Sequence, residues 1–399
     1  MQMLESGASM SEWRRIPAGK IACQRREVVR LQPGIEYRTM GVRWHGKGAY
    51  DRGTATTETV KAKSLYRART GDFTFNRIDT QKGAFDVIPA ELDGALATNE
   101  FPLYEVDAQE MDARFLLLNF QRPEVLRQIG AMRAGSEGRA RWKEADFEGW
   151  MIPLPPLCVQ KRIVEVAAAI NDQINALSAE AETLEALLAG RKEEVFAEYA
   201  VTGTTLPIGQ VLEEIKRPII VNPEAEYRQI GIRSHGRGLF TKEPVTGESL
   251  GSKKVFWVEP GDLVINIVFA WEGAVAVVPP DIVEYCGSHR FPTYRRTDGG
   301  DVEFIRLFLT SKTGTRLLAD CSPGGAGRNR TLNRKRLMQS PVALPSPQEQ
   351  ERVVGELKAL DVQVAALREE ADKLGQARTA LISGLIDRTI DIKSAELGV

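Results

Sequence analysis

The sequence predicts an α+β protein made of two copies of one unit: two duplicated α+β domains separated by two long antiparallel coiled-coil helices. Two observations predict this fold class. Matching segments recur at an offset of 190 residues, which is close to half of the 399-residue chain. Each copy also ends in a long run of heptad-spaced apolar residues, preceded by short strand-like runs that Gly, Pro and Asp separate.

The heptad runs extend from Leu157 to Ala200 and from Pro347 to Ile390. Apolar residues that recur every seven positions in two rows form the buried seam of a coiled coil. Only Arg378 interrupts the rows of the second run. The residues that we expect in contacts between the helices, or between the helices and a partner, are Ile163, Ile170, Ile174, Leu177, Leu184, Val353, Leu360, Val364, Leu367 and Leu374.

Each helix of about 44 residues would be roughly 65 Å long, which is more than a small domain needs. Because the duplicated units would be related by an approximate two-fold axis, we expect the helices to lie antiparallel, with the globular domains at opposite ends. The alternative is that each helix folds back on its own domain. Pro-rich segments at 153–156 and 344–347 set the points where the helices begin.

The globular part of each copy is expected to consist mainly of strands and turns, followed by one or two helices. Residues 36–48 and 226–238 agree at eight of thirteen positions, and helical spacing follows at 113–129 and 302–318. A one-residue slip between Tyr104 and Pro155 changes the offset and is later undone. The predicted boundaries are 1–152 for the first domain, 153–202 for the first helical region, 203–343 for the second domain and 344–392 for the second helical region.

The composition is that of an ordered globular protein, with 43% hydrophobic and 27% charged residues. The four cysteines lie far apart, without zinc-site spacing or the framework of a small secreted protein, which favours a reducing, cytoplasmic location. No signal peptide is visible. The most apolar run, Leu263–Val278, is broken by Asn266 and Glu272 and is too short to cross a bilayer, so we expect buried strands there and no membrane association.

The net charge of −1 conceals an uneven distribution of charge. Residues 156–200 carry eight acidic and four basic residues, which leaves the globular domains relatively basic. The strongest basic cluster, residues 322–336, contains five cations and no anion, and residues 134–143 form a weaker counterpart. Glycine permits close approach to a phosphate, and Arg and Asn can donate bidentate hydrogen bonds to guanine and adenine. The clusters indicate nucleic-acid binding; the alternative is a solvated surface loop.

A His-Gly segment around His45 recurs around His235. It superficially matches a phosphate-binding loop, but Gly48 stands where that loop needs Ser or Thr, and Arg237 replaces Lys47 in the second copy. On a turn that faces a groove, these residues suit contacts with phosphates or bases. The alternative is that both histidines are buried, hydrogen-bonded structural residues.

Catalytic constellations are largely absent from the sequence. It has three histidines, no HExxH motif, no Cys/His metal-ligand spacing and no Gly-x-Ser-x-Gly segment. The Asp/Asn-Pro-Pro-Tyr/Phe tetrapeptide of amino-methylating enzymes is also missing. We therefore expect no catalytic residues and no metal ligands in this chain.

The chain resembles the specificity (S) subunit of type I restriction-modification systems over nearly its whole length. The resemblance rests first on two Pro-rich helix entries, at 152–164 with Gln160 and Arg162 and at 344–354 with Gln350 and Arg352, each followed by a heptad helix. Segments 288–292 and 324–330 are also similar to recognition domains of this family. The first copy departs from both, at 98–100 and at Glu137.

The resemblance implies that each domain is a target-recognition domain. Each would enter the major groove at one half of a bipartite, asymmetric DNA site, while the helix pair would set the spacer and dock the methyltransferase subunits. The residues that we expect to bind DNA are Arg43, His45, Lys47, Asn76, Arg139, Arg141, Arg233, His235, Arg237, Asn266, His289, Arg290, Arg328, Asn329 and Arg330.

The resemblance also implies the partners. They are double-stranded DNA, two methyltransferase (M) subunits and restriction/translocase (R) subunits, and S-adenosylmethionine, ATP and magnesium would belong to those subunits, with no cofactor in this chain. Two other functions remain open. One is a coiled-coil adaptor that binds protein or RNA partners without sequence-specific DNA recognition, and the other is a DNA enzyme that uses His45 or His235.

Overall fold

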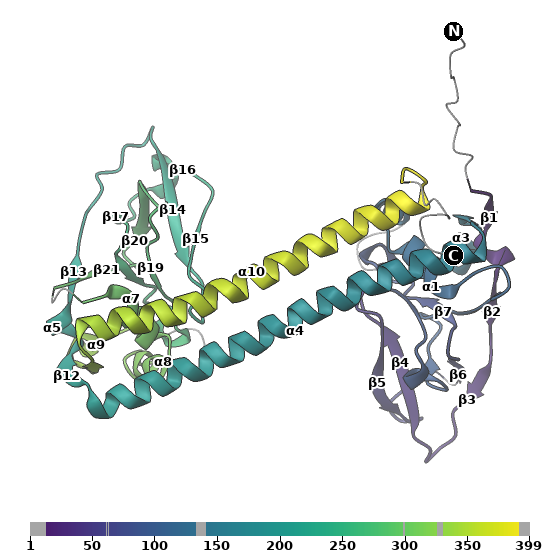
Figure 1. The fold of residues 1–399 in the computed structure, drawn as a ribbon, viewed down its shortest axis with the longest axis horizontal. Coiled ribbons are helices and arrows are strands. Elements are labelled where there is room, and N and C mark those ends of the chain that lie inside the picture. The colour runs from purple at the N-terminus through teal and green to yellow at the C-terminus, as the bar shows by residue number, and fades with distance from the viewer. Residues whose placement is uncertain are drawn as a thin grey trace, which may run out of the picture. The chain divides into compact units, whose positions relative to one another are not determined.

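The computed structural model describes residues 13–60, 62, 64–132, 141–297, 300–324 and 330–390. Two compact units are present: the first contains the residues up to Ala176 and those from Glu370, and the second contains Leu177–Glu369. Each unit consists of an α+β domain and parts of two long helices, α4 (Leu157–Thr202) and α10 (Pro347–Ile386) (Figure 1). The α+β fold class is as predicted.

The first domain contains a four-stranded sheet in the order β2-β10-β7-β8, a five-stranded sheet in the order β3-β6-β9-β4-β5 and the pair β1-β11. Its strands are β1 (Arg15–Pro17), β2 (Ala22–Arg25), β3 (Val28–Arg30), β4 (Tyr37–Val42), β5 (Ala49–Ala55), β6 (Ser64–Arg67), β7 (Phe73–Phe75), β8 (Phe85–Val87), β9 (Leu96–Ala97), β10 (Leu103–Val106) and β11 (Met151–Pro153). Its helices are α1 (Ala113–Phe120), α2 (Pro123–Ala131), α3 (Glu144–Glu148) and the 3-10 turns η1 (Ala18–Lys20), η2 (Thr80–Lys82) and η3 (Ala90–Leu92).

The second domain has corresponding sheets in the orders β13-β21-β18-β19 and β15-β14-β20-β17 and the pair β12-β22, but β16, which pairs with β14, joins its five-stranded sheet in place of a counterpart of β3. Its strands are β12 (Thr204–Pro207), β13 (Leu212–Ile215), β14 (Glu226–Ile232), β15 (Leu239–Thr241), β16 (Val245–Thr246), β17 (Val255–Val258), β18 (Leu263–Ile265), β19 (Val275–Val277), β20 (Tyr285–Ser288), β21 (Thr293–Arg296) and β22 (Pro341–Leu344). Its helices are α5 (Ile208–Val211), α6 (Gly247–Leu250), α7 (Val302–Leu309), α8 (Lys312–Asp320), α9 (Arg334–Gln339) and the 3-10 turn η4 (Ala270–Glu272).

Equivalent strand pairs establish that the two domains share one fold. The pair β4-β9 is parallel among otherwise antiparallel pairs, and so is its counterpart β14-β20. The apolar run that begins at Leu263 forms β18 and β19, which are buried as predicted. Among the described residues, none of the helices combines the length and the apolar character that a membrane crossing needs.

The one-residue slip in the repeat lies at α1 and α2. The N-cap carboxylate of α1, Asp112, accepts a hydrogen bond from the amide of Arg114 at 2.8 Å, and Asp301 does the same for Glu303 at the start of α7. These caps are 189 residues apart, whereas the N-caps of α3 and α9, Lys143 and Asn333, are again 190 apart. The slip is therefore undone before α3.

A dense aromatic core fills the first domain and continues onto the long helices. Phe73, Phe75 and Phe147 pack against one another, and Ile163 at the start of α4 belongs to the same buried cluster as Leu385 at the end of α10. The core of the first unit is thus completed by both helices. Burial of these aromatic and aliphatic side chains is the main source of its stability.

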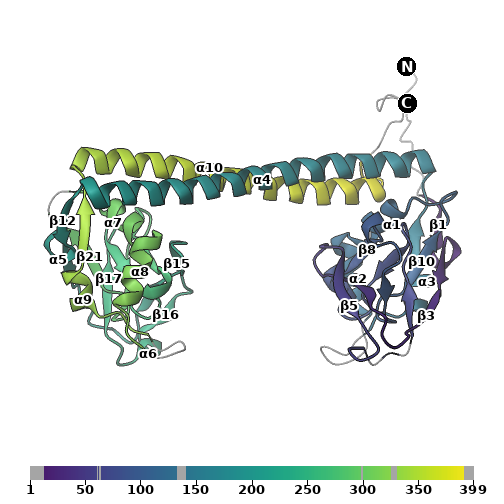
Figure 2. The same ribbon diagram turned by 90° about the horizontal axis from the view of Figure 1, so that it is seen from below.

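In the second unit the opposite ends of the helices meet. Phe196, near the end of α4, packs on Phe304 of α7, and the same cluster contains Val353 near the start of α10. Figure 2 shows α7 beside the two helices. Arg191 of α4 also pairs with Glu356 of α10 at 2.6 Å. The helices therefore pair antiparallel, as predicted, and do not fold back separately on their own domains.

Buried glutamines fix the start of each long helix. Gln160 donates from Nε2 to the carbonyl of Pro155 at 2.8 Å and accepts from the amide of Asp112 at 2.9 Å. Gln350 makes the equivalent bond to Pro345 at 3.0 Å. The predicted helix starts are correct, but α10 ends at Ile386, four residues before the predicted end.

The predicted seam residues lie where the heptad pattern requires. Ile163, Leu177, Val353 and Val364 are buried. The others are half-buried and so keep part of their apolar surface open to solvent: Ile170, Ile174, Leu184, Leu360, Leu367 and Leu374.

Candidate nucleic-acid interface

The His-Gly segments form the hairpin turns between β4 and β5 and between β14 and β15. His45 and His235 adopt positive φ angles of 60° and 61°. The amide of His45 donates to the carbonyl of Lys82 at 2.6 Å, and that of His235 donates to Glu272 at 2.7 Å. Backbone bonds hold the turns, and both imidazoles are exposed. The alternative that these histidines are buried structural residues is therefore wrong.

Cations stacked on aromatic rings flank each turn. The Arg43 guanidinium lies 4.2 Å from the centre of the Tyr50 ring, and that of Arg233 lies 4.9 Å from the centre of the Phe240 ring. The second ring packs directly over Gly231, where a Cβ atom would lie 2.3 Å from Phe240 Cζ. Glycine is required at this strand position because any side chain would displace the ring. The stack holds its arginine at the surface, where it forms no ion pair with a carboxylate of the described residues.

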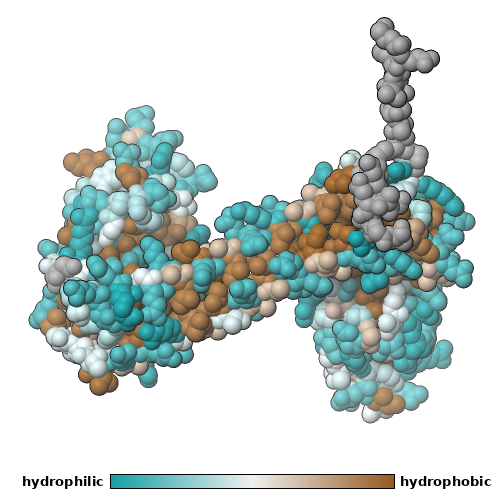
Figure 3. Space-filling model, in the orientation of Figure 1, coloured by the Kyte–Doolittle hydropathy of each residue, from teal (hydrophilic) through white to brown (hydrophobic). Residues whose placement is uncertain are grey.

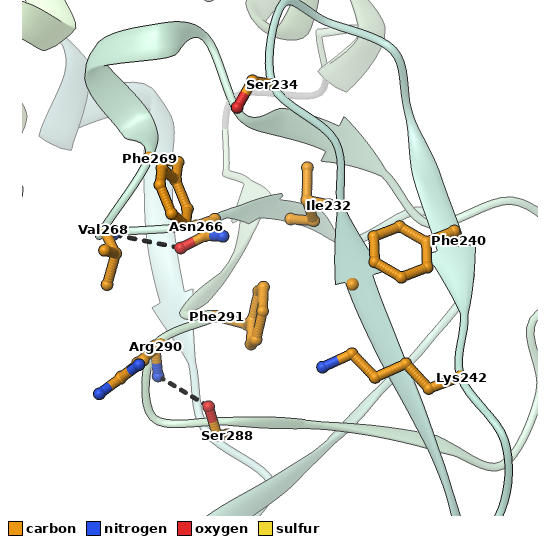
Figure 4. Close-up of a pocket in the computed structure, with 11 residues that line it drawn as sticks. Ile232, Ser234, Phe240, Lys242, Asn266, Val268, Phe269, Ser288, Arg290 and Phe291 are labelled. Carbon is orange, nitrogen blue, oxygen red and sulfur yellow. Dashed lines mark hydrogen bonds between the residues drawn. The ribbon is translucent and has the colours of Figure 1, made fainter. Parts of the chain in front are cut away.

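The second domain has a cavity of about 400 Å³ beside this stack (Figure 4). Figure 4 shows Lys242 and the Asn266 amide directed toward its middle, with Arg290 at its rim. The described side chains that line it include no carboxylate. Its floor is aromatic, and Lys242 Nζ lies 6.0 Å from the centre of the Phe291 ring. Cationic and amide donors over apolar walls suit the acceptor-rich edge of a base or a phosphate.

The predicted asparagines have a structural role as well. Asn266 Oδ1 accepts a hydrogen bond from the amide of Val268 at 3.1 Å, and Asn76 Oδ1 accepts one from Ile78 at 2.9 Å. Each oxygen thus closes a turn after the sheet strand. Of the two, only Asn266 lines the cavity described above.

The equivalent surface of the first domain has different charges. Glu100 stands at the position of Arg290, Arg52 at that of Lys242 and Trp44 at that of Ser234. Arg141 forms a bidentate ion pair with Glu100: its Nη2 donates to Oε1 at 2.8 Å and its Nε donates to Oε2 at 3.2 Å. The predicted DNA-binding residue Arg141 is therefore already paired.

The remaining predicted residues are dispersed. Arg330 stacks on Trp271, with 5.1 Å between the guanidinium and the ring centre, while Lys47, Arg237 and His289 are exposed. Arg237 lines a separate cavity near the helices. Arg139, Arg328 and Asn329 lie outside the described residues.

Lys242 and Ser234 line the cavity together with Asn266 and Arg290, but they were not among the predicted DNA-binding residues. The available signal was the two-residue step from Phe240 to Lys242, which places both side chains on one face of an extended segment. No group of His, Cys, Asp and Glu side chains suited to a metal occurs within the described part of the chain.

The duplicated domains, their cation-bearing surfaces and the antiparallel helices define one class of architecture, that of type I restriction-modification S subunits. Two solved structures carry this conclusion. A chain of a type I R-M system, from a study of its complex assembly and conformational transition, matches with a TM-score of 0.62 and 19% identity over 94% of this chain and 97% of that chain. The type I restriction-modification S subunit from M. genitalium matches with a TM-score of 0.55 and 12% identity over 98% and 99%.

A third solved structure, the HsdS subunit from Thermoanaerobacter tengcongensis, matches with a TM-score of 0.49 and 18% identity over 95% of this chain and 97% of that chain. Neither a protein-family model nor a curated protein matches the sequence. The chain thus has the fold of type I S subunits, which is the fold that the resemblance implied.

Proposed function

We propose that this chain is the DNA sequence-recognition subunit of a type I restriction-modification complex. The observation that carries the proposal is that the likeness to such proteins includes both domains and both long helices, over 94–98% of the chain. The carboxylate-free cavity of the second domain adds a surface whose chemistry suits nucleic acid.

Each domain would recognise one half of a bipartite DNA site. The two domains share a topology, but they differ at cavity positions, with Glu100 in one and Arg290 in the other. Carboxylates accept hydrogen bonds from cytosine N4, whereas Arg donates to guanine O6 and N7. Different side chains on one scaffold would give an asymmetric site.

The helix pair would set the spacer and dock the two methyltransferase subunits. Both helices expose apolar surface along their length (Figure 3), including Leu187 of α4 at 55% exposure and Val362 of α10 at 59%. Exposed apolar side chains together with half-buried seam residues suit contacts with a partner protein.

The chain itself would be non-catalytic and cytoplasmic. The M subunits would carry S-adenosylmethionine, and the R subunits would carry ATP and magnesium. Restriction and methylation would then need these subunits, with this chain supplying only the choice of sequence.

The test is the binding of random-sequence duplex DNA by the full chain, alone and with its M subunits, over a range of salt concentrations. A DNA-recognition subunit shows affinity that falls steeply as salt rises, because cationic side chains release counterions from phosphates. Affinity without salt dependence, or absence of DNA binding, would favour a protein adaptor. Methylation or cleavage by the chain alone would contradict the non-catalytic assignment.

A further inference from the structure

A second cavity, in the first unit, lies between the His45 turn and the long helices. Its volume is about 560 Å³, and its lining includes His45 and Gly46 from the hairpin turn, Gln81 and Lys82 from η2, and Arg378 from α10. Gln121 and Asn171 add amide groups. Among the described residues that line it there is no carboxylate.

Arg378 is the unusual member of this set. It occupies the seam row of α10 between Ala371 and Leu385, both of which are buried apolar residues. Its Nε atom is buried and makes no hydrogen bond to any described residue. Burial lowers the pKa of this guanidinium. Arg378 as a whole is half-buried. A guanidinium stays charged in proteins, so one whose Nε is shielded from water and unbonded favours an anion as partner.

The other copy shows that the fold does not require this charge. The counterpart of Arg378 in α4 is Leu188, which packs against the core of the second unit. The counterpart of Asn171 is Asp361, and Asp361 lines the equivalent cavity together with Glu185 and Glu303. The second cavity thus has carboxylates among its cations, and two of them pair with Arg306 and Arg368, whereas the described lining of the first cavity contains none.

The cavity is continuous with the surface that the proposed function uses. Gly46 has a φ of +66° and nothing within 4 Å of its Cβ direction, so a ligand can approach the backbone closely. Lys82 is stacked 4.4 Å from the centre of the Trp44 ring, and its ammonium also pairs with Asp79 at 2.9 Å, so Arg378 is the cation of this lining that lacks an ion pair with a described residue. Lys82 and Arg378 thus reach the cavity from η2 and from α10.

We propose that this cavity binds one phosphate of the DNA backbone and that Arg378 is its main donor. The inference rests on the proposed function, since it takes DNA to be the ligand of the domain beside it. A phosphate supplies the missing counterion, and the guanidinium can hold two of its oxygens. The contact is independent of base sequence and exists in the first unit only.

The test compares Arg378→Leu with the wild-type full chain in binding to a random-sequence duplex at several salt concentrations. Leucine is the residue of the other copy, so the fold should be retained and the melting temperature should stay equal or rise. We expect roughly tenfold weaker binding and a salt slope smaller by about 0.9, the change expected for one phosphate contact. Arg378→Lys should keep the slope because it keeps the charge.

Arg368→Leu is the matched control. Arg368 lies on the same helix and pairs with Glu185 at 2.6 Å, so its removal should leave the salt slope unchanged. If wild-type binding depends on salt and Arg378→Leu binds with the same slope, the inference is wrong while the proposed function stands. If the wild type itself shows no salt-linked binding, the proposed function fails first.

Two further outcomes would also overturn the inference. If Arg378→Leu abolishes assembly with the M subunits and leaves the DNA affinity of the free chain intact, the occupant is a carboxylate of a partner protein. If inorganic phosphate raises the melting temperature of the wild type but not of Arg378→Leu, while duplex binding is equal, the site holds a free anion.

Discussion

Glu100 and Arg290 occupy equivalent positions in the two domains, each directly before the Phe-Pro pair that precedes the central strands β10 and β21. Glu100 is neutralised by Arg141 at 2.8 Å. Arg290, on the rim of the carboxylate-free cavity, makes no ion pair with a described residue. One scaffold position therefore carries opposite charges, which is the basis for expecting two different half-sites.

Arg290→Ala should relax recognition at the half-site of the second domain only. Loss of an Arg contact to a base costs about 1–3 kcal/mol of discrimination at that position. Methylation by the reconstituted complex on a randomised duplex library would measure the effect. Arg52→Ala is the reciprocal control, because it should affect only the other half-site; a uniform loss at both halves would indicate phosphate contacts alone.

Gly231→Ala should destabilise the chain by about 1–3 kcal/mol, because the new methyl group would overlap the Phe240 ring. The free energy of unfolding from denaturant titration measures the change. Gly190→Ala on α4 is the control, since nothing lies within 4 Å of its Cβ direction, and it should stabilise by about 0.5–1 kcal/mol. In a chain that already carries Phe240→Ala, Gly231→Ala should lower the free energy of unfolding by less, because the ring is gone. If the effects of the two substitutions on that free energy are simply additive, the clash does not occur.

Removal of one heptad from each helix, residues 177–183 and 367–373, should shorten the spacer of the DNA site. Seven helical residues span about 10 Å, or roughly three base pairs. Sequencing of methylated DNA would give the new spacing, and a control that replaces the same residues with another heptad of equal length should leave it unchanged. An unaltered spacer in the shortened variant would show that the helices do not set it.

The junction of α4 and α10 in the second unit should depend on acidic pH. Glu349 accepts hydrogen bonds from Tyr199 and Arg352, both at 2.7 Å, and these lower its pKa from 4.5 to about 2. A lowered folded-state pKa stabilises above the unfolded value and loses that contribution as the pH falls. The melting temperature of Glu349→Gln should therefore lie below that of the wild type at neutral pH, with a difference that shrinks between pH 4.5 and 2.

Glu194→Gln is the control for this pH dependence. Glu194 is exposed on α4 and reaches Arg191 only at 3.6 Å. A difference between wild type and Glu349→Gln that stays constant down to pH 2 would mean that the carboxylate charge is not what holds the junction.

The fold was largely predictable because periodicity and duplication are properties of the sequence itself. The heptad rows located both helices, and the repeated glycine positions implied a shared domain topology. The predicted helix starts were accurate because they depend on local contacts: Gln160 and Gln350 each donate a hydrogen bond to the carbonyl of a proline five residues earlier. The predicted end of α10 was wrong, because the apolar spacing in the sequence continues past Ile386, whereas the helix ends at that residue.

The site was less predictable because it depends on neighbours distant in sequence. Arg141 has the chemical character of a DNA-contacting residue. Its guanidinium is nevertheless paired with Glu100, which lies 41 residues earlier in the chain. Asn76 has the same chemistry as Asn266, but the cavity of about 400 Å³ is lined by Asn266 and lies in the second domain. Arg378 was recognisable in the sequence as an interruption of the apolar seam. Its proposed role could not be predicted, because the cavity that it lines is formed with η2 and the hairpin turn, which are distant in sequence.

Methylation mapping of DNA from cells that carry this chain and its M subunits tests the central claim most directly. The account predicts methylation at a bipartite, asymmetric motif with a fixed gap, which disappears when this chain is removed and changes in one half when Arg290 is replaced. Methylation that persists without the chain, or that falls on one uninterrupted motif, would contradict it.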